Sequence, residues 1–356
     1  MSQFSKDLIS WYQTNKRTFP WRENINVYHT WICEVMSQQT TLAVVLPRFK
    51  EFINTLPDLS SLANCSDEKL RKLWVGLGYY ARARNLRNGA KYIIENFNNK
   101  FPSSKDEWLK VPGCGPYTAS IISSICFNEP VACVDGNVIR VVSRILGMSE
   151  GVWEKIGQEK ILCYVSECIP KNSPGCFNQA MMDLGATLCK KQNPNCQDCP
   201  VKKYCSAFKK NIISICPPNK PRKDFQDENI FALLLQRNKN SEFSLILRDK
   251  GFLAKTKGFP LLCSKEGHTK EKIIAVLKNL KINGTCLEKT FKHSITHHKI
   301  TGHTFLIDCD EGDNKVKKLL KTFALNEKND WFDIPHLQQN ISSSLDQKVL
   351  KTLFSK

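Results

Sequence analysis

Four cysteines within seventeen residues place the strongest constraint on how this chain can fold. They are Cys189, Cys196, Cys199 and Cys205, and the middle two form a Cys-x-x-Cys pair. Four thiolates at these intervals can close on one metal centre, and both iron–sulfur clusters and zinc are bound by such sets. The spacing predicts a metal centre over residues 189–205 and on its own leaves both kinds open.

The remaining cysteines indicate a reducing compartment. The chain has 16 cysteines in 356 residues, and no hydrophobic segment after Met1 resembles a signal peptide. This differs from a secreted disulfide scaffold, so we expect most thiols to be reduced and buried. The longest apolar stretches, such as 118–127, are well short of the ~20 residues of a membrane span. We expect a soluble intracellular monomer, cytoplasmic or associated with the bacterial nucleoid, without membrane contact.

A second constraint is a glycine-rich corner between two helical segments, Val111-Pro112-Gly113-Cys114-Gly115-Pro116. Ser103 or Ser104 can cap the helix before the corner, and Pro116 suits the first turn of the helix after it. The pattern predicts a helix-hairpin-helix whose turn brings backbone N–H groups against a phosphate. A plain tight turn could have the same sequence, so the corner alone does not decide its function.

Two carboxyl groups are candidates for chemistry. Asp135 precedes the apolar run that begins at Val138, so it can cap a helix and be a fixed carboxylate at the same time. Glu34 has apolar and aromatic neighbours in sequence, from Trp31 to Met36. Such surroundings keep a carboxyl group protonated, as a general acid near neutral pH requires. A solvated helix glutamate is the alternative.

The overall charge suits a polyanionic partner, although a solvated basic surface is the alternative. The sequence has 52 Lys and Arg against 34 Asp and Glu, a formal net charge of +18 and a pI near 9.2. Residues 74–85 add paired glycines, paired tyrosines and two arginines. These could stack on bases and bind phosphates, or form a helix junction with buried tyrosines. Gln38 and Gln39 are likewise surface amides or probes of base edges.

The residue pattern changes at a basic, proline-rich stretch, which predicts two domains. Residues 1–215 have helical spacing, 216–228 form a linker, and 229–356 indicate a smaller α+β domain. Within the smaller domain we expect strands over 230–235, 243–247 and 303–308, and helices over 270–280 and 345–353. Residues 291–298 hold three of the seven histidines, and we expect a polar loop there rather than a metal site.

Five further segments complete a recognisable set: 20–22 (PWR), 34–40 (EVMSQQT), 76–80 (GLGYY), 134–138 (VDGNV) and 177–186 (FNQAMMDLGA). With the corner and the four cysteines, in this order, they resemble the adenine DNA glycosylases of the MutY family. That family lies within the helix-hairpin-helix and Gly/Pro-Asp superfamily of base-excision enzymes. The resemblance covers nearly the whole chain.

The resemblance implies an all-α helix-hairpin-helix glycosylase domain followed by an α+β domain of the MutT-like (Nudix) fold. It also implies that the four cysteines hold a [4Fe–4S] cluster, which sets zinc aside. The implied reaction is excision of adenine opposite 8-oxoguanine or guanine in duplex DNA. Adenine must leave the stack to be reached, and its extrusion from such a mispair is cheaper than from a normal pair.

Functional residues of the family fall on matching positions of this chain. Glu34 matches the general acid that protonates adenine at N7. Asp135 matches the carboxylate that stabilises the sugar cation or captures it covalently. The other matches are Asn137 and Tyr117, which support that site, Arg22 and Gln179, which contact the flipped base, Gln39 and Tyr79, which probe or wedge the duplex, and Gly113, Gly115 and Thr118, which bind the DNA.

Alternative functions differ at identifiable residues. Endonuclease III shares the corner and the cluster but cleaves the strand with a lysine, and this chain has Tyr117 at that position. A phenol cannot form a Schiff base, so we expect a monofunctional glycosylase. A DNA-binding cluster protein without catalysis and a cluster-based electron carrier are two further alternatives. Neither would need both Glu34 and Asp135.

The second domain is expected to recognise the damaged base rather than to hydrolyse nucleotides. It lacks the acidic Arg-Glu-x-x-Glu-Glu helix of a pyrophosphohydrolase, because residues 270–280 carry only Glu271. The family's Phe-Ser-His loop falls on Ile295-Thr296-His297, which keeps the hydroxyl and imidazole but loses the aromatic ring. We therefore expect Thr296 and His297 to contact 8-oxoguanine.

Overall fold

The chain divides into two compact units, Met1–Pro221 and Arg222–Lys356. The computed structural model describes residues 1–221, 224–237, 242–254, 256–295, 297–309, 313–341 and 343–354. The division falls inside the segment 216–228 that the sequence predicts to be a linker. Among the described residues, no helix is both long enough and apolar enough to cross a membrane.

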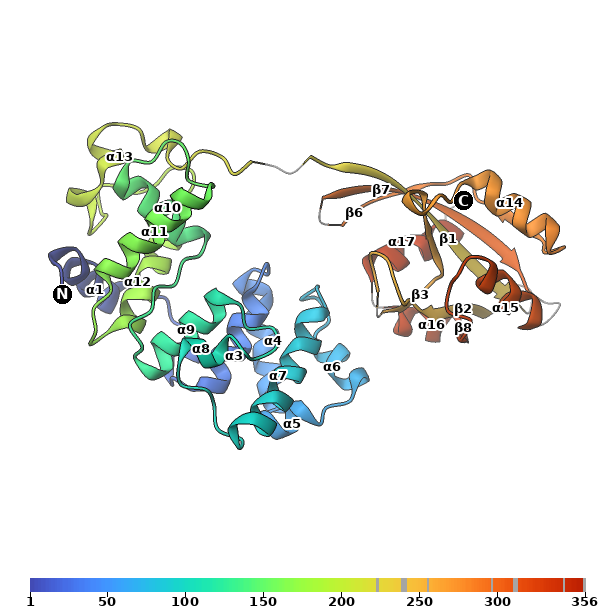
Figure 1. Cartoon of the computed structure of the whole chain (residues 1–356), viewed down its shortest axis with the longest axis horizontal. Helices are drawn as coiled ribbons and strands as arrows, with labels where there is room; N and C mark the ends of the chain where they lie inside the picture. Colours follow the sequence, from blue (N-terminus) through green and yellow to red (C-terminus); the bar gives the residue numbers. More distant parts are fainter. Residues whose placement is uncertain are drawn as a thin grey trace. The chain divides into compact units, whose positions relative to one another are not determined.

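The first unit is built from helices, and within 1–221 the structure has no strand (Figure 1). Its α-helices are α1 (Gln3–Asn15), α2 (Pro20–Glu23), α3 (Val27–Ser37), α4 (Leu42–Thr55), α5 (Leu59–Ala63), α6 (Asp67–Leu73), α7 (Ala81–Phe97), α8 (Lys105–Trp108), α9 (Pro116–Phe127), α10 (Gly136–Leu146), α11 (Lys155–Cys168), α12 (Pro174–Thr187) and α13 (Ser206–Lys209). Two short 3-10 helices, η1 (Lys202–Tyr204) and η2 (Ile213–Ile215), flank α13.

Capping residues explain where the helix-hairpin-helix begins and turns. The Ser104 hydroxyl accepts the Glu107 N–H at 3.3 Å, and the Glu107 carboxylate accepts the Ser104 N–H at 3.1 Å, which closes a capping box on α8. Pro116 is the first residue of α9. Between them, Gly113 has a φ of +85°, and a Cβ there would meet Asn85 Cβ at 2.8 Å. The predicted hairpin is confirmed, and its corner requires glycine.

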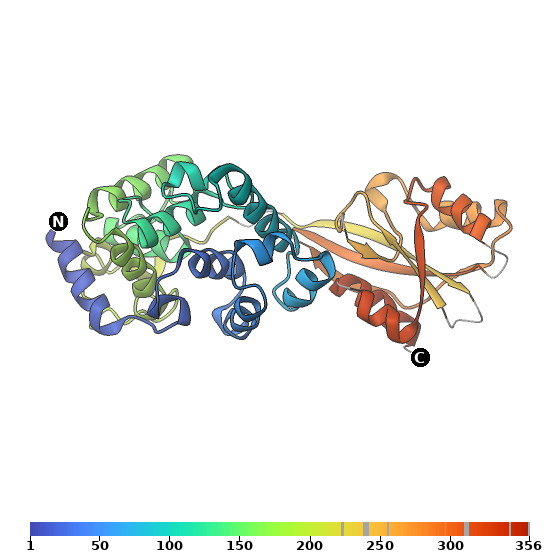
Figure 2. The same ribbon diagram turned by 90° about the horizontal axis from the view of Figure 1, so that it is seen from below.

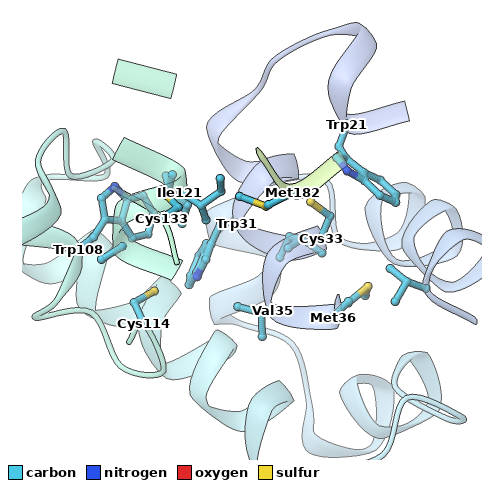
Figure 3. Close-up of a cluster of buried hydrophobic side chains, with 14 of the residues drawn as sticks. Trp21, Trp31, Cys33, Val35, Met36, Trp108, Cys114, Ile121, Cys133 and Met182 are labelled. Atoms are coloured by element: carbon cyan, nitrogen blue, oxygen red, sulfur yellow. The ribbon is translucent and has the colours of Figure 1, made fainter. Parts of the chain in front are cut away.

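Most side chains of α3 are buried in the core of the first unit (Figure 3). Trp31 packs against Trp108 with ring centroids 5.7 Å apart, and both side chains are fully buried. Ile32, Val35 and Met36 are buried as well. Close packing fixes the position of the helix, so any polar side chain on its remaining face has a fixed place.

The second unit is a mixed sheet with helices. Its strands are β1 (Gln226–Arg237), β2 (Glu242–Leu247), β3 (Lys257–Gly258), β4 (Leu261–Cys263), β5 (Gly284–Cys286), β6 (Phe291–Ile295), β7 (His298–Asp308) and β8 (Asn329–Asp333). Its helices are η3 (Ser264–Glu266), α14 (Lys270–Asn279), α15 (Asp313–Thr322), α16 (Ile334–Asn340) and α17 (Ser344–Phe354). The order β3-β2-β1-β7-β5 forms the main path, in which β1 and β7 are parallel and the other pairs antiparallel.

Alternation along β1 directs its side chains to two cores, one on each face of the sheet. Phe231, Leu233 and Leu235 pack with α14 and α15. Ile230, Ala232 and Leu234 pack with α16 and α17 on the opposite face. The two pairs of helices therefore cover the two faces, as the views in Figures 1 and 2 also show.

The structure extends the predicted elements of the second unit and corrects one of them. Each expected strand and helix is present. The polar loop expected over 291–298 is wrong, because Phe291–Ile295 forms β6 and pairs antiparallel with the start of β7. Lys292 and Ser294 are exposed while Phe291 is buried, so one strand face is polar and the other packs inward. This alternation produces a hairpin from a sequence rich in polar residues.

Candidate active site

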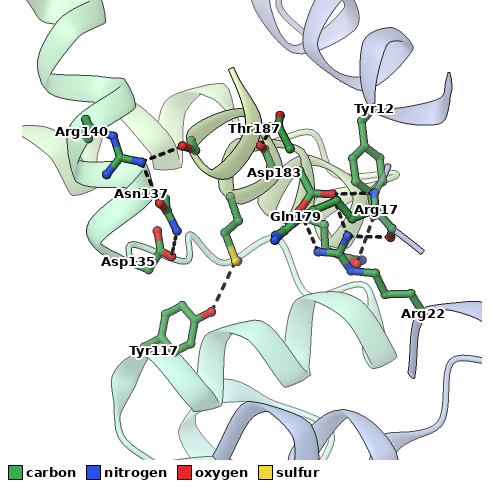
Figure 4. Close-up of polar contacts among 12 residues, drawn as sticks. Tyr12, Arg17, Arg22, Tyr117, Asp135, Asn137, Arg140, Gln179, Asp183 and Thr187 are labelled. Carbon is green, nitrogen blue, oxygen red and sulfur yellow. Dashed lines mark hydrogen bonds and ion pairs between the residues drawn. The ribbon is translucent and has the colours of Figure 1, made fainter. Parts of the chain in front are cut away.

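One cavity of about 340 Å³ in the first unit gathers most of the predicted catalytic and base-contacting residues. Its lining includes Glu34, Tyr117, Asp135, Asn137, Arg22 and Gln179. They come from α2, α3, α9, α10 and α12, with Asp135 directly before α10, so residues separated by as much as 157 positions line one cavity. Figure 4 shows five of these six side chains with their polar partners. A cavity of this size can enclose a purine base, which is the kind of ligand that pockets of a few hundred Å³ accept.

Glu34 faces the cavity from the one polar side of α3. Burial raises the pKa of its carboxyl to about 7, and the Tyr117 hydroxyl and the Arg22 charge oppose that rise. The nearby Asp135 carboxylate raises the pKa of Glu34 further. The group can therefore hold a proton at neutral pH and release it to a base within reach.

Asp135 caps α10, as the sequence predicts. Its Oδ1 accepts the Val138 N–H at 2.7 Å, and its Oδ2 accepts from Asn137 Nδ2 at 2.9 Å (Figure 4). These two donors fix the orientation of the carboxyl group at the start of the helix. The side chain lines the cavity with a fixed orientation.

Asn137 is itself held from behind by Arg140. Arg140 Nη2 donates to Asn137 Oδ1 at 2.8 Å and to the Gly185 carbonyl at 2.7 Å, while its Nε donates to the Cys189 carbonyl at 2.8 Å. A Cβ on Gly185 would lie 2.6 Å from Asn137 Cβ, so glycine permits this approach of α12 to α10. These contacts fix the amide that donates to Asp135, and the sequence reasoning did not include Arg140.

A buried carboxylate holds Arg22 at the cavity, and the sequence reasoning missed it. Asp183 on α12 is fully buried and accepts from Arg22 at 2.7 and 3.1 Å and from Arg17 at 2.6 and 2.8 Å. Burial alone would raise the pKa of Asp183, but the two guanidinium groups outweigh it and hold that pKa below its usual range. A single acid in the apolar run of 180–184 was the available signal, because a buried acid needs partners.

Gln179 and Tyr117 both line the cavity, and each also contacts a neighbouring side chain. Gln179 is 8% exposed, and its Oε1 accepts from the buried Tyr12 hydroxyl at 3.1 Å. The Tyr117 hydroxyl lies 3.4 Å from Met182 Sδ, and burial raises the pKa of Tyr117 well above its usual value. Tyr117 is therefore a neutral phenol beside Glu34, and none of the described residues that line this cavity is a lysine.

The residues predicted to bind the duplex lie outside the cavity, on two turns and at the hairpin corner. Gln39 and Tyr79 are exposed, Tyr79 to 58%, and both have left-handed backbone, with φ of +57° and +46°. Gly113 and Gly115 flank Cys114 in the corner, and Gly115 precedes the first turn of α9. Thr118 differs, because its side chain is buried and its hydroxyl accepts from Gln38 at 3.3 Å. Its side chain is therefore not available to a partner at the surface.

The four cysteines line one cavity of the first unit. Cys189, Cys196, Cys199 and Cys205 surround it together with Arg144, whose Nη1 donates to Cys189 Sγ at 3.2 Å. Within the described part of the chain, no three Cys, His, Asp or Glu side chains lie close enough together to hold a single metal ion.

One of the two predicted 8-oxoguanine contacts lies in the part of the chain that the structure describes. Thr296 lies outside the described residues, whereas His297 lies in the turn between β6 and β7 and its carbonyl accepts the Gln226 N–H at 2.9 Å. The His297 ring is 4.3 Å from the ring of His298, which meets Phe252 edge to face at 4.8 Å.

Comparison with known proteins identifies the family. Residues 32–162 match the HhH-GPD superfamily of base excision DNA repair proteins. The chain is 31% identical over 354 residues to an adenine DNA glycosylase of Buchnera aphidicola from Schizaphis graminum, and the alignment covers 98% of each chain. The chain belongs to the adenine DNA glycosylase family. It is also 36% identical over 216 residues to the human adenine DNA glycosylase, covering 58% of this chain and 40% of that one.

A solved structure supports the fold of the first unit. A thermostable thymine-DNA glycosylase aligns with a TM-score of 0.54 and 25% identity, over 58% of this chain and 95% of that one. As a member of the adenine DNA glycosylase family, the chain is a DNA N-glycosylase of base excision repair that removes adenine from DNA. The cavity with Glu34 and Asp135 is the candidate active site for this hydrolysis.

Proposed function

We propose that this adenine DNA glycosylase acts on adenine opposite 8-oxoguanine or guanine and that it hydrolyses the N-glycosidic bond without cleaving the strand. The observation that carries the proposal is the single cavity that joins Glu34, Tyr117 and Asp135. An extruded adenine that enters it would meet a proton donor and a fixed anion at once.

Glu34 is the general acid of the proposed reaction. Its proton moves to adenine N7, and the bond between N9 and C1′ then breaks with its electron pair going to the base. A carboxyl group with a pKa of about 7 is about half protonated at neutral pH, so the acid form is available. Arg22 and Gln179 line the same cavity and would hold the base in place.

Asp135 stabilises the positive charge that develops on the sugar as the bond breaks. A fixed anion held by two N–H donors acts on the transition state without rearranging. Water then adds at C1′ and releases one proton to solvent, which leaves an abasic site. Asn137 would keep Asp135 oriented, and the Tyr117 hydroxyl would hydrogen-bond to the Glu34 carboxyl group.

Tyr117 supports the monofunctional mechanism. A lyase requires an amine that forms a Schiff base with the sugar, and the cavity lining, as far as the structure describes it, contains arginine but no lysine. Borohydride should therefore trap no covalent complex with substrate DNA. Trapping at the level of a lysine-dependent glycosylase, run in parallel, would contradict this part of the proposal.

A [4Fe–4S] cluster fits the four cysteines. Their side chains face one common cavity, and Arg144 donates to Cys189 Sγ, as donors to ligand sulfurs do in such centres. The cluster would tie residues 189–205 into one loop. Arg144 also donates to the carbonyls of Lys190 at 2.8 Å and Lys191 at 3.2 Å, so this chain's own residues hold the start of that loop.

The second unit is proposed to be a MutT-like (Nudix-fold) domain that recognises 8-oxoguanine through Thr296 and His297. His297 lies in the turn between β6 and β7, where the side chains of a hairpin tip can reach a partner. Replacing both residues with alanine should reduce the preference for A:8-oxoguanine over A:G. An unchanged preference would remove this assignment and leave the active site as proposed.

The test of the overall proposal is adenine release from three duplexes that differ only at the base opposite adenine. We expect release from A:8-oxoguanine and A:G and none from A:T, with Glu34→Gln inactive on all three. Equal release from A:T would refute the mispair specificity. Release by Glu34→Gln at the wild-type rate would refute the active site.

A further inference from the structure

Two exposed turns of the first unit depart from ordinary backbone geometry. Gln39 follows α3 with a φ of +57°, and Tyr79 precedes α7 with a φ of +46°. Left-handed backbone is uncommon for residues other than glycine, and where it occurs the surrounding structure has to maintain it. Both side chains are exposed. The structure therefore needs a group that fixes both turns.

The guanidinium group of Arg82 binds both turns at once. Its Nη1 donates to the carbonyls of Val35 at 2.8 Å and Met36 at 2.9 Å, at the end of α3. Its Nη2 donates to the carbonyls of Leu77 at 2.7 Å and Gly78 at 3.2 Å, directly before Tyr79. The planar, five-donor shape of arginine allows this, and a lysine ammonium could not reproduce it.

Thr40 closes the connection between the turns. Its hydroxyl accepts from Arg82 Nη2 at 3.0 Å and lies 3.2 Å from the Leu77 carbonyl, to which it donates. The residue directly after Gln39 is therefore hydrogen-bonded to the segment directly before Tyr79. Each of these hydrogen bonds contributes little to stability by itself. Together they join two segments that lie about forty residues apart in the sequence.

Aromatic rings and burial complete the setting of Arg82. Its guanidinium lies 5.5 Å from the Trp74 ring centroid and 5.8 Å from that of Tyr79. Among the described residues, no carboxylate forms an ion pair with it, and its Nε is buried without a partner. Its charge is held by carbonyl dipoles and ring faces, so it acts on backbone shape rather than on an acidic partner.

We infer that Arg82 is a positioning residue that makes the Gln39 and Tyr79 turns one rigid unit for opening the duplex at the mispair. The inference rests on the proposed contacts of Gln39 and Tyr79 with DNA. In this inference Arg82 acts through the two turns and contacts neither base nor sugar. Its effect is on adenine extrusion, because a wedge and a probe with fixed separation enter the helix together.

The first test compares Arg82→Lys with wild type on two substrates. One is an A:8-oxoguanine duplex, and the other carries the same adenine in an unpaired bubble that needs no wedge. We expect adenine release under single turnover to slow by about tenfold on the duplex and by less than about twofold on the bubble. Equal slowing on both substrates would show a general structural defect and overturn the inference.

The second test asks whether Arg82 acts through the turn. In a Tyr79→Ala background, Arg82→Lys should slow duplex release by less than about twofold more, because coupled residues are not additive. A full additional tenfold loss would overturn the inference. If Tyr79→Ala and Gln39→Ala both release adenine at the wild-type rate, the proposed DNA contacts fail instead, which is a separate outcome.

A matched control lies five residues further along α7. Arg87 also donates to a backbone carbonyl, that of Cys65 at 3.0 Å, and pairs with Asp67 at 2.7 Å. Arg87→Lys should leave the ratio of duplex to bubble activity unchanged. If Arg82→Lys does not fold, Thr40→Val removes one link between the turns and should lower the same ratio. An unchanged ratio for Thr40→Val would overturn the inference.

Discussion

The two carboxylates of the cavity stand in opposite surroundings. Glu34 lies on α3 between buried neighbours, and burial raises its pKa from 4.5 to about 7. Asp135 begins α10 and accepts from a backbone N–H and from an amide at 2.7 and 2.9 Å. Because burial penalises charge at Glu34 whereas two donors hold the Asp135 carboxylate, we propose that the same functional group serves as an acid at one position of the cavity and as an anion at the other.

Removing the acid should cause the largest loss. Glu34→Gln keeps the size and hydrogen-bonding capacity of the side chain but cannot deliver a proton to adenine. We expect single-turnover release from A:8-oxoguanine DNA to fall by about 10³- to 10⁴-fold while the Kd for the duplex stays within about threefold. A fall of less than about tenfold would mean that protonation is not the step that Glu34 serves.

Removing the anion should cost somewhat less and should leave the fold intact. Asn is as good a helix cap as Asp, so Asp135→Asn can still accept the Val138 N–H. We expect release to slow by about 10²- to 10³-fold with less than about 1 kcal/mol change in the free energy of unfolding. Thermal unfolding is the control, and a loss of several kcal/mol would show that Asp135 is mainly a cap.

The dependence of the rate of adenine release on pH tests Glu34 separately from Asp135. Glu34 must be protonated, and its pKa is about 7. Activity should therefore fall as pH rises through 7, by about tenfold per unit in the alkaline limb. The measurement is the rate constant of adenine release under single turnover from pH 5 to pH 9. A flat profile across this range would place the essential acid elsewhere.

The same shift predicts a pH-dependent stability. The folded pKa of Glu34 is raised, so the stabilisation by its neutral form is complete below about pH 4.5 and lost as pH rises through about 7. Glu34→Gln has no such dependence. Between pH 4 and pH 8, the variant should gain up to about 3 kcal/mol in free energy of unfolding relative to wild type. Urea unfolding at both pH values measures this difference, and no change with pH would contradict the shift.

The sequence predicts the cap at Asp135 and the hairpin corner because these depend on neighbours along the chain. Ser104, Pro116 and Asp135 each act within three residues of themselves. The apolar strands of the second unit are likewise visible from local pattern, whereas β3 has two residues and β5 three, too few for a period to show.

Contacts between distant segments are what the sequence does not reveal. Asp183 holds Arg17 and Arg22 across 166 and 161 positions, and no local spacing encodes that pairing. The resemblance placed Arg22 at the base without showing what keeps it there. Arg82 is similar, because its five acceptors lie in two segments, 35–40 and 77–78, that meet only in the folded chain.

A substitution of Arg140 weakens the support of Asp135 without changing either carboxyl group. Arg140 supports Asp135 and not Glu34, since it donates to Asn137 Oδ1 and the Asn137 amide donates to Asp135. Arg140→Gln should slow adenine release by about tenfold, less than Asp135→Asn, because the carboxylate remains while its orientation loosens. The alkaline limb of the pH profile should stay in place, since Glu34 is untouched.

A second effect of Arg140 has to be separated from the first. The same side chain donates to the Cys189 carbonyl at 2.8 Å, so Arg140→Gln could also disturb the cysteine loop. Iron and sulfide content should therefore be measured with the rate. In an Asn137→Ala background, loss through orientation alone should nearly disappear, whereas loss through the loop should persist at about tenfold. A shift of the alkaline limb in Arg140→Gln would instead show that the two carboxyl groups are coupled, and that the surroundings of Glu34 alone do not set its role.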